Sequence, residues 1–181
     1  MRRSDLEHLI RAAGRVAGER ELIIIGSQSV LGQFPQAPVA LLMSMEADLY
    51  PRAHPELADK VDGAIGEGSA FHQAHGYYAQ GVGPDTATLP RGWQRRLVRV
   101  DNENTNGYVG LCLEVHDLAI SKYVAGREKD REFTRELARC GMIDAATLAQ
   151  RLAATRLDPA VAKLARARIA RDFSPPKRRK R

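Results

Sequence analysis

The sequence predicts an α+β fold, in which a mixed β-sheet with flanking helices is followed by a C-terminal helical region. Up to residue 115, short apolar and β-branched runs bounded by Gly, Pro and Asn indicate strands. Beyond that residue, apolar positions recur with the spacing of α-helices. We therefore expect an α/β core at 1–115, a helical region at 116–173 and a disordered basic tail at 174–181.

The chain begins with a predicted amphipathic helix. Ser4 and Glu7 have the spacing of a capping box, and Gly18 is placed to end the helix. The apolar residues that share one face are Leu6, Leu9, Ile10, Ala13 and Val16. A short apolar run at 22–25 then predicts a buried strand.

That strand stops at Gly26-Ser27, a pair typical of a tight turn into a helix, and we expect a short helix from Ser27 to about Gln33. A second strand is predicted at 39–49. Since side chains alternate across a strand, its apolar face holds Leu41, Met43, Met45, Ala47 and Leu49, and its polar face Ser44, Glu46 and Asp48. Two carboxylates that point the same way in a sheet are costly unless they serve a purpose such as metal binding.

The remaining elements follow from turn signals and periodicity. Pro55 opens a helix, and three glycines interrupt residues 63–69. Further strands are predicted at 77–82, 95–100 and 108–115, the last two joined by the polar hairpin Asp101–Gly107. Helices are predicted at 116–126, 129–139, 144–154 and 158–171, with Asp144 and Asp158 as caps of the last two.

Composition is that of an ordinary globular protein. The chain has 181 residues, 44% of them apolar and 28% charged. No apolar run approaches the roughly 20 residues that cross a bilayer, and the N-terminus lacks the apolar core of a signal peptide, so we expect a cytoplasmic protein with no membrane partner. Cys112 and Cys140 lie in apolar segments, which predicts buried free thiols.

The net charge of +6 is concentrated at the end of the chain. Residues 177–181 are all Lys or Arg and supply five of the six charges. Such a tail can hold the phosphates of an RNA without reading its sequence, or can simply increase solubility. Both interpretations stay open.

Two segments together resemble a known superfamily. They are Gly26-Ser27 followed by a strand that ends Glu46-Ala47-Asp48, and the later segment 116–130, which carries Lys122 and Arg127-Glu128-Lys129-Asp130. Over residues 20–145 the chain is similar to the nucleotidyltransferases with a polymerase-β-like fold. More narrowly, it resembles small stand-alone bacterial nucleotidyltransferase-like proteins of unassigned substrate, some of which are related to toxin-antitoxin components.

The chemistry of these residues is consistent with the resemblance. Backbone N–H groups at Gly26-Ser27 suit phosphates, and Glu46 and Asp48 suit Mg²⁺, with Mn²⁺ as an alternative. Lys122 and Lys129 are seven residues apart, which places them two turns apart along one face of a helix, and one of them can pair with the triphosphate if that helix lies against the site. The resemblance favours Lys122 as the partner of the triphosphate; the other interpretation makes 127–130 a solvated charged face.

These observations predict a transfer of a nucleoside monophosphate from a nucleoside triphosphate to a hydroxyl of an RNA, protein or small molecule, with Glu46 and Asp48 as the catalytic, metal-binding residues. The superfamily usually has Asp-x-Asp and a third carboxylate on a neighbouring strand. Here Gln80 stands where an acid is expected, and Asp101 or Glu114 would have to substitute. The alternative is therefore a catalytically inactive module that binds a partner protein, for example in a toxin-antitoxin pair.

Other patterns point to different sites. His72 and His75, or Cys112 and His116, have spacings seen in zinc ligands, but nothing in the sequence brings the pairs together. His116-Asp117 resembles the His-Asp pair of phosphohydrolases, but the further histidines that those sites need are absent. Asp117 also fits the first turn of a helix. Tyr77, Tyr78 and Trp93 are core residues or base-stacking residues.

Overall fold

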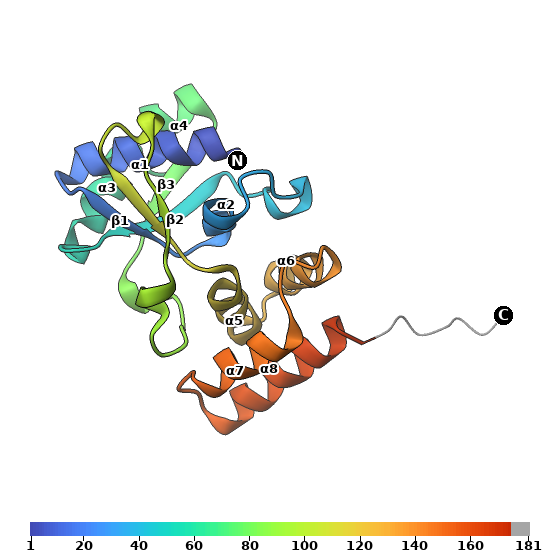
Figure 1. Ribbon diagram of the computed structural model, residues 1–181. Coiled ribbons are helices and arrows are strands. Elements are labelled where there is room, and N and C mark those ends of the chain that lie inside the picture. Colours follow the sequence, from blue (N-terminus) through green and yellow to red (C-terminus); the bar gives the residue numbers. More distant parts are fainter. Residues whose placement is uncertain (175–181) are drawn as a thin grey trace.

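Five strands form one mixed sheet, in the order β3-β2-β1-β5-β4, in the computed structural model (Figure 1). The structure describes residues 1–174, so the predicted basic tail lies, apart from Ser174, outside the described residues. The strands are β1 (Glu21–Ile24), β2 (Glu46–Pro51), β3 (Tyr78–Gly81), β4 (Val98–Val100) and β5 (Val109–Cys112). The helices are α1 (Arg3–Ala17), α2 (Val30–Gln33), α3 (Ala58–Ile65), α4 (Ala70–His75), α5 (Val115–Ala125), α6 (Glu128–Arg139), α7 (Ala145–Ala153) and α8 (Pro159–Asp172). The predicted α+β class is confirmed.

β1 is the central strand because it is apolar on both faces. Leu22, Ile23 and Ile24 are all buried, as expected of a strand that is covered on both sides. β1 pairs antiparallel with β2 and parallel with β5, while β3 runs parallel to β2 and β4 antiparallel to β5. The Ile25 N–H donates to the carbonyl of Asp48 at 3.0 Å. The chain therefore leaves β1 directly beside the acidic part of β2.

α1 packs against the sheet through its predicted apolar face. Leu6, Leu9 and Ile10 are fully buried. Gly110 on β5 leaves room for this approach, because a Cβ there would meet the end of the Ile10 side chain. The predicted capping box is wrong: the helix begins at Arg3, and Glu7 instead accepts hydrogen bonds of 2.8 Å from Arg3 and from two asparagines of the β4–β5 hairpin. Those donors outweigh the effect of burial, and the pKa of Glu7 is lowered.

The second strand is shorter than predicted. It begins at Glu46, while residues 39–41 form a 3₁₀ turn and 42–45 are irregular. Met43 and Met45 are consequently 74% and 56% exposed instead of buried with Leu41. The reason is that β1 pairs only with residues 49–51 and β3 only with 46–49, so the segment before Glu46 has no strand to pair with.

Other differences lie at boundaries. Residues 93–96 form a 3₁₀ turn before β4, and helix α4 at Ala70–His75 was not predicted. Its signals are local: the Ser69 hydroxyl accepts a hydrogen bond from the His72 N–H at 3.1 Å, and Gly76 ends the helix with a φ of 74°.

Cys112 and Cys140 are free thiols as predicted, although Cys140 is only half-buried. No helix within residues 1–174 has the length and apolar character needed to cross a membrane.

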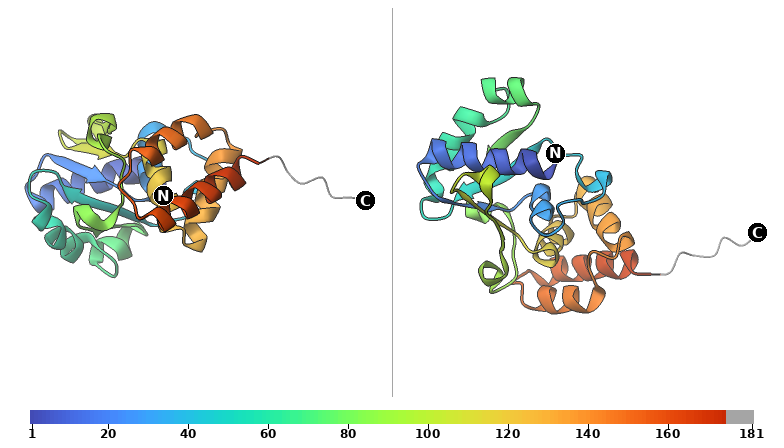
Figure 2. Two further views of the ribbon diagram at one scale, coloured as in Figure 1. Left: turned by 90° about the horizontal axis from the view of Figure 1, so that it is seen from below. Right: turned by 45° about the horizontal axis from the view of Figure 1, so that its top comes forward.

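Helices α5 to α8 form a group of their own, apart from α1, α3 and α4 (Figure 2). Asp144 caps α7 and Asp158 caps α8, as predicted. The Arg168 guanidinium of α8 donates to the carbonyls of Tyr123 and Val124 at the end of α5. α8 therefore fixes the C-terminal turn of α5.

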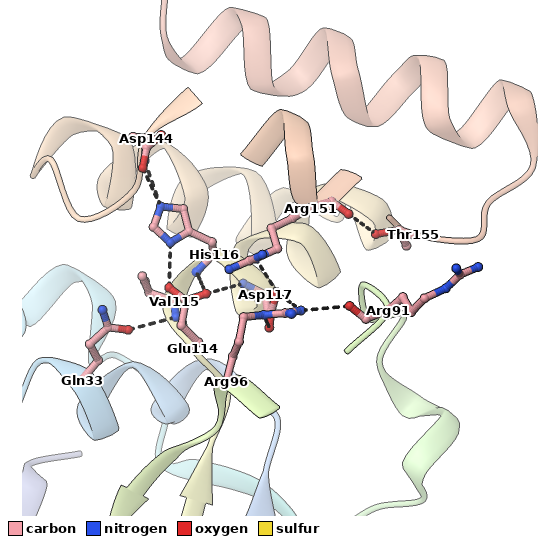
Figure 3. Close-up of polar contacts among 10 residues, drawn as sticks. All are labelled: Gln33, Arg91, Arg96, Glu114, Val115, His116, Asp117, Asp144, Arg151 and Thr155. Atoms are coloured by element: carbon pink, nitrogen blue, oxygen red, sulfur yellow. Dashed lines mark hydrogen bonds and ion pairs between the residues drawn. The ribbon is translucent and has the colours of Figure 1, made fainter. Parts of the chain in front are cut away.

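A polar network fixes the other end of α5 (Figure 3). Gln33 accepts a hydrogen bond from the Val115 N–H at 3.2 Å. The buried carboxylate of Asp117, in the first turn of α5, accepts two hydrogen bonds from Arg96, at 2.8 and 3.0 Å, and lies 3.2 Å from Arg151 of α7. This one carboxylate joins the sheet side of the molecule to the helical group.

We predict that Asp117→Asn lowers the free energy of unfolding by about 2 kcal/mol at neutral pH, because it leaves the guanidinium groups of Arg96 and Arg151 without their counterion. Burial raises the pKa of Asp117 despite these two arginines, so the cost of burying the ionised carboxylate offsets part of the loss. Denaturant unfolding measures the change. Asp101→Asn is the control, since it removes an exposed pair with Arg99 and should cost less than about 1 kcal/mol. Equal effects of the two substitutions would contradict the structural role of Asp117.

Candidate active site

The turn after β1 lies directly under the carboxylate of Asp48. A Cβ at Gly26 would collide with the carboxylate and the Cβ of Asp48, so glycine at this position leaves room for the carboxylate over the turn. Gly26 has an extended backbone, and Ser27 begins the 3₁₀ turn Ser27–Ser29 that leads into α2. The predicted strand, Gly-Ser turn and short helix are thus present, and they face the acidic strand.

Glu46 and Asp48 are two residues apart on β2 and share a face, as predicted. Both are half-buried. The Tyr78 hydroxyl donates to Glu46 Oε2 at 3.2 Å, and Lys129 Nζ lies 3.9 Å from Glu46 Oε1. Burial and the hydrogen bond to Glu46 help to raise the pKa of Tyr78 to about 12. Tyr78 is therefore a hydrogen-bond donor that orients Glu46, and not a base.

The surroundings of Asp48 disfavour its charge. Burial raises the pKa of Asp48 above its usual value, and the nearby negative charge of Glu46 raises it further. The positive charges of Lys122, Lys129 and Arg127 act in the opposite direction without cancelling the effect. A cation that bound between the two carboxylates would therefore stabilise the ionised form of Asp48.

Lys122 and Lys129 lie on two helices, so the predicted single helical face is wrong. Gly126 ends α5 with a φ of 63°, and α6 begins at Glu128. A Cβ at Gly126 would also collide with the Arg168 guanidinium that holds the end of α5. The break turns α6 back along the site, and both lysines still reach it.

Asp130 is the residue of this site that sequence reasoning did not assign. Its carboxylate is 1% exposed, 3.3 Å from Lys122 Nζ and 2.7 Å from Arg127 Nε. Burial alone would raise the pKa of Asp130, but the hydrogen bonds and charges of Arg127 and Lys122 outweigh it and lower the pKa. Arg127, Glu128 and Lys129 are exposed, as the interpretation of 127–130 as a solvated face requires, but Asp130 is buried, and Arg127 and Lys129 also reach the site.

Two cavities meet at Lys122. The larger, of about 650 Å³, is bordered by Ser27, Glu46, Lys122 and Lys129, with loop 40–44 and α6 as its walls. The smaller, of about 120 Å³, is bordered by Gly26, Asp48, Lys122, Arg127 and the loop Thr86–Thr88. Each predicted site residue, namely Gly26, Ser27, Glu46, Asp48, Lys122 and Lys129, borders at least one of the two.

No third carboxylate joins Glu46 and Asp48 to form a metal cluster. Within residues 1–174 no group of three or more His, Cys, Asp or Glu side chains is arranged to hold a metal. Gln80 is the β3 residue paired with Asp48. Asp101 pairs with Arg99, and Glu114 caps α5 and pairs with His116, so neither completes the site.

The other sequence patterns do not form sites in the described structure. Cys112 is buried in β5, and His116 lies between Glu114 and Asp144, away from His72, whose ring packs on Tyr78. The two pairs with zinc-like spacing are thus not brought together. None of the three aromatics considered for base stacking borders the two cavities; Phe133 of α6 is the aromatic in the wall of the larger one.

Comparison with known proteins agrees with the resemblance seen in the sequence. A family model described as a nucleotidyltransferase of unknown function (DUF6036) matches residues 4–179. The match includes nearly all of α1 and the whole of α8, which lie outside the segment 20–145 that carried the resemblance. No curated protein and no solved structure matches the chain.

We predict that Asp130→Asn lowers the free energy of unfolding by about 3 kcal/mol at neutral pH, because Lys122 loses its buried counterion. Since the pKa of Asp130 is lowered in the folded state, this stabilisation exists above the unfolded pKa and disappears as pH falls through the folded one. The difference between variant and wild type should therefore shrink in acid. Glu136→Gln, on the same helix and in a pair with the exposed Arg139, is the control and should change stability by less than about 1 kcal/mol.

Asp48→Asn should have the opposite effect on stability. The raised pKa means that the folded state favours protonated Asp48, so the ionised carboxylate destabilises the fold at neutral pH. We expect the variant to unfold at an equal or higher denaturant concentration than the wild type at neutral pH, and the two to converge as pH falls through the raised pKa. Marked destabilisation at neutral pH would show that the carboxylate has a structural role instead.

Proposed function

The chain belongs to a family of nucleotidyltransferases of unknown function, and we propose that it transfers a nucleoside monophosphate from a nucleoside triphosphate to a hydroxyl of an acceptor. The observation that supports this is the convergence of Ser27, Glu46, Asp48 and Lys122 on two adjoining cavities. A cavity of about 650 Å³ has the size of known small-molecule sites. The acceptor can be an RNA, a protein or a small molecule.

The two carboxylates fit one Mg²⁺ ion, or Mn²⁺ in its place. Mg²⁺ in nucleotide sites commonly binds one or two carboxylates and completes its shell with waters and substrate phosphates. The raised pKa of Asp48 reflects crowding of negative charge beside Glu46, which a divalent cation would relieve. When bound there, the ion neutralises the triphosphate and polarises the α-phosphoryl group.

The chain's own groups bind and orient the nucleotide. In this proposal, backbone N–H groups and the hydroxyl at Gly26-Ser27 donate to phosphate oxygens. Lys122 carries the positive charge that offsets the leaving pyrophosphate, and Asp130 fixes its ammonium group. The acceptor oxygen bonds to the α-phosphorus, the bond to the β-phosphate oxygen breaks, pyrophosphate leaves with the electron pair, and the hydroxyl proton passes to solvent or to a carboxylate.

A second candidate is a catalytically inactive module that binds a partner protein, as in a toxin-antitoxin pair. Gln80 favours it, because a neutral amide stands beside Asp48 where a third carboxylate would bind a second ion or accept the proton. In this case the protein would have the fold of the family but would not bind nucleotide with a metal ion.

Calorimetric titration of each nucleoside triphosphate in the presence of Mg²⁺ separates the two candidates. We expect the wild type to bind, and Glu46→Ala/Asp48→Ala to bind at least about tenfold more weakly, a loss of about 1.4 kcal/mol. The matched control is Glu56→Ala/Asp59→Ala, which removes the same two kinds of carboxylate from exposed positions outside both cavities. Absence of binding by the wild type, or equal binding by all three proteins, would favour the inactive module.

A further inference from the structure

Positive charge outside the tail is concentrated in two segments. Residues 86–100 contain four arginines and no acidic residue, a net charge of +4. Residues 145–171 contain six basic residues and one acid, Asp158, a net charge of +5. The first segment includes most of the loop between β3 and β4, and the second comprises α7 and nearly all of α8. The basic character of the protein is thus not confined to 177–181.

Only some of these charges are used inside the fold. Arg96 and Arg151 are paired with Asp117, and Arg168 is bound to the end of α5. Arg91 and Arg156 are exposed, and neither makes an ion pair within residues 1–174. In Figure 3 the side chain of Arg91 points away from the Asp117 network. Both guanidinium groups are therefore available to an external anion.

These two arginines border one cavity. It measures about 600 Å³ and is bordered by Leu89, Arg91, Ala153, Ala154, Thr155 and Arg156, with no carboxylate among them. The Arg91 N–H donates to the carbonyl of Ala154 at 2.9 Å, which holds the loop against the end of α7. The cavity is thus built by two elements that are hydrogen-bonded together and presents two unpaired cations.

The same loop connects this cavity to the candidate active site. Thr86, Ala87 and Thr88 border the small cavity beside Asp48, and Arg91 follows Thr88 by three residues, a span of at most about 11 Å. Trp93, two residues after Arg91, packs against the core and does not border this cavity. The cavity therefore offers cations and no aromatic platform, which suits contacts to the phosphates of a nucleic-acid strand.

We propose that the cavity at Arg91 and Arg156 binds the backbone of a single-stranded RNA whose end enters the small cavity beside Asp48. This inference rests on the proposed function, since it names the acceptor of the same site. The terminal hydroxyl of the RNA is then the attacking oxygen, and the chain grows by one nucleoside monophosphate with release of pyrophosphate. Arg91 and Arg156 are positioning residues that hold the strand and do not touch the reacting atoms.

The test measures RNA binding in the absence of nucleotide and Mg²⁺. The readout is the fluorescence anisotropy of a labelled single-stranded RNA of about 12 nucleotides. We expect Arg91→Gln/Arg156→Gln to weaken binding at least about tenfold and to reduce the salt slope by about 1.4, the value for two lost phosphate contacts on a single strand. The matched control is Arg15→Gln/Arg131→Gln, which removes two exposed arginines without ion pairs in residues 1–174 and leaves the tail unchanged. Equal losses in the two variants, or no RNA binding by the wild type, would overturn the proposal.

A second measurement distinguishes this proposal from the proposed function. Glu46→Ala/Asp48→Ala should lose nucleotide affinity, and Arg91→Gln/Arg156→Gln, which lies outside both active-site cavities, should keep it. If nucleotide binding depends on the carboxylates but RNA binding does not depend on the two arginines, the nucleotide site stands and the RNA acceptor is rejected.

Discussion

The close approach of Asp48 to Gly26 is the constraint on which the site depends. The carboxylate lies where the Cβ of any other residue at position 26 would be. This contact is possible because β1 and β2 pair antiparallel and Ile25 bonds to the carbonyl of Asp48. The end of β1, the start of the 3₁₀ turn and the acidic strand are therefore fixed relative to one another by backbone hydrogen bonds, and loop side chains need not hold them.

The helical region supports the other side of the site. Asp117 holds the first turn of α5 to Arg96 and Arg151, and Arg168 of α8 holds its last turn. Lys122 lies between these two anchors and is fixed by Asp130 from α6. A buried ion pair contributes little net stability but is costly to break, so the Lys122–Asp130 pair serves mainly to place a cation. Residues 145–174 thus matter to a site whose two cavities they do not border.

The local elements of this fold could be predicted from sequence, and the contacts between distant segments could not. The run 22–25, the Gly26-Ser27 turn and the caps Asp144 and Asp158 depend on neighbouring residues alone, and the structure contains all of them. The length of β2 depends on which strands lie beside it, which periodicity does not reveal, and Met43 and Met45 were misplaced for that reason. Asp130 was missed because a buried acid within a charged run looks the same in sequence as a solvated one.

Gln80 explains how the site differs from one with three carboxylates. Its amide donates to Asp62 Oδ1 at 3.2 Å, and the same oxygen accepts a hydrogen bond from the Gly81 N–H at 3.1 Å. A carboxylate at position 80 would place a negative charge against Asp62 as well as beside Asp48, whose own charge is already disfavoured. This edge of the site is therefore built around a neutral amide. In the proposed reaction, positive charge at this edge of the site comes from Lys122, Lys129 and Arg127, of which Lys122 and Arg127 are held by Asp130.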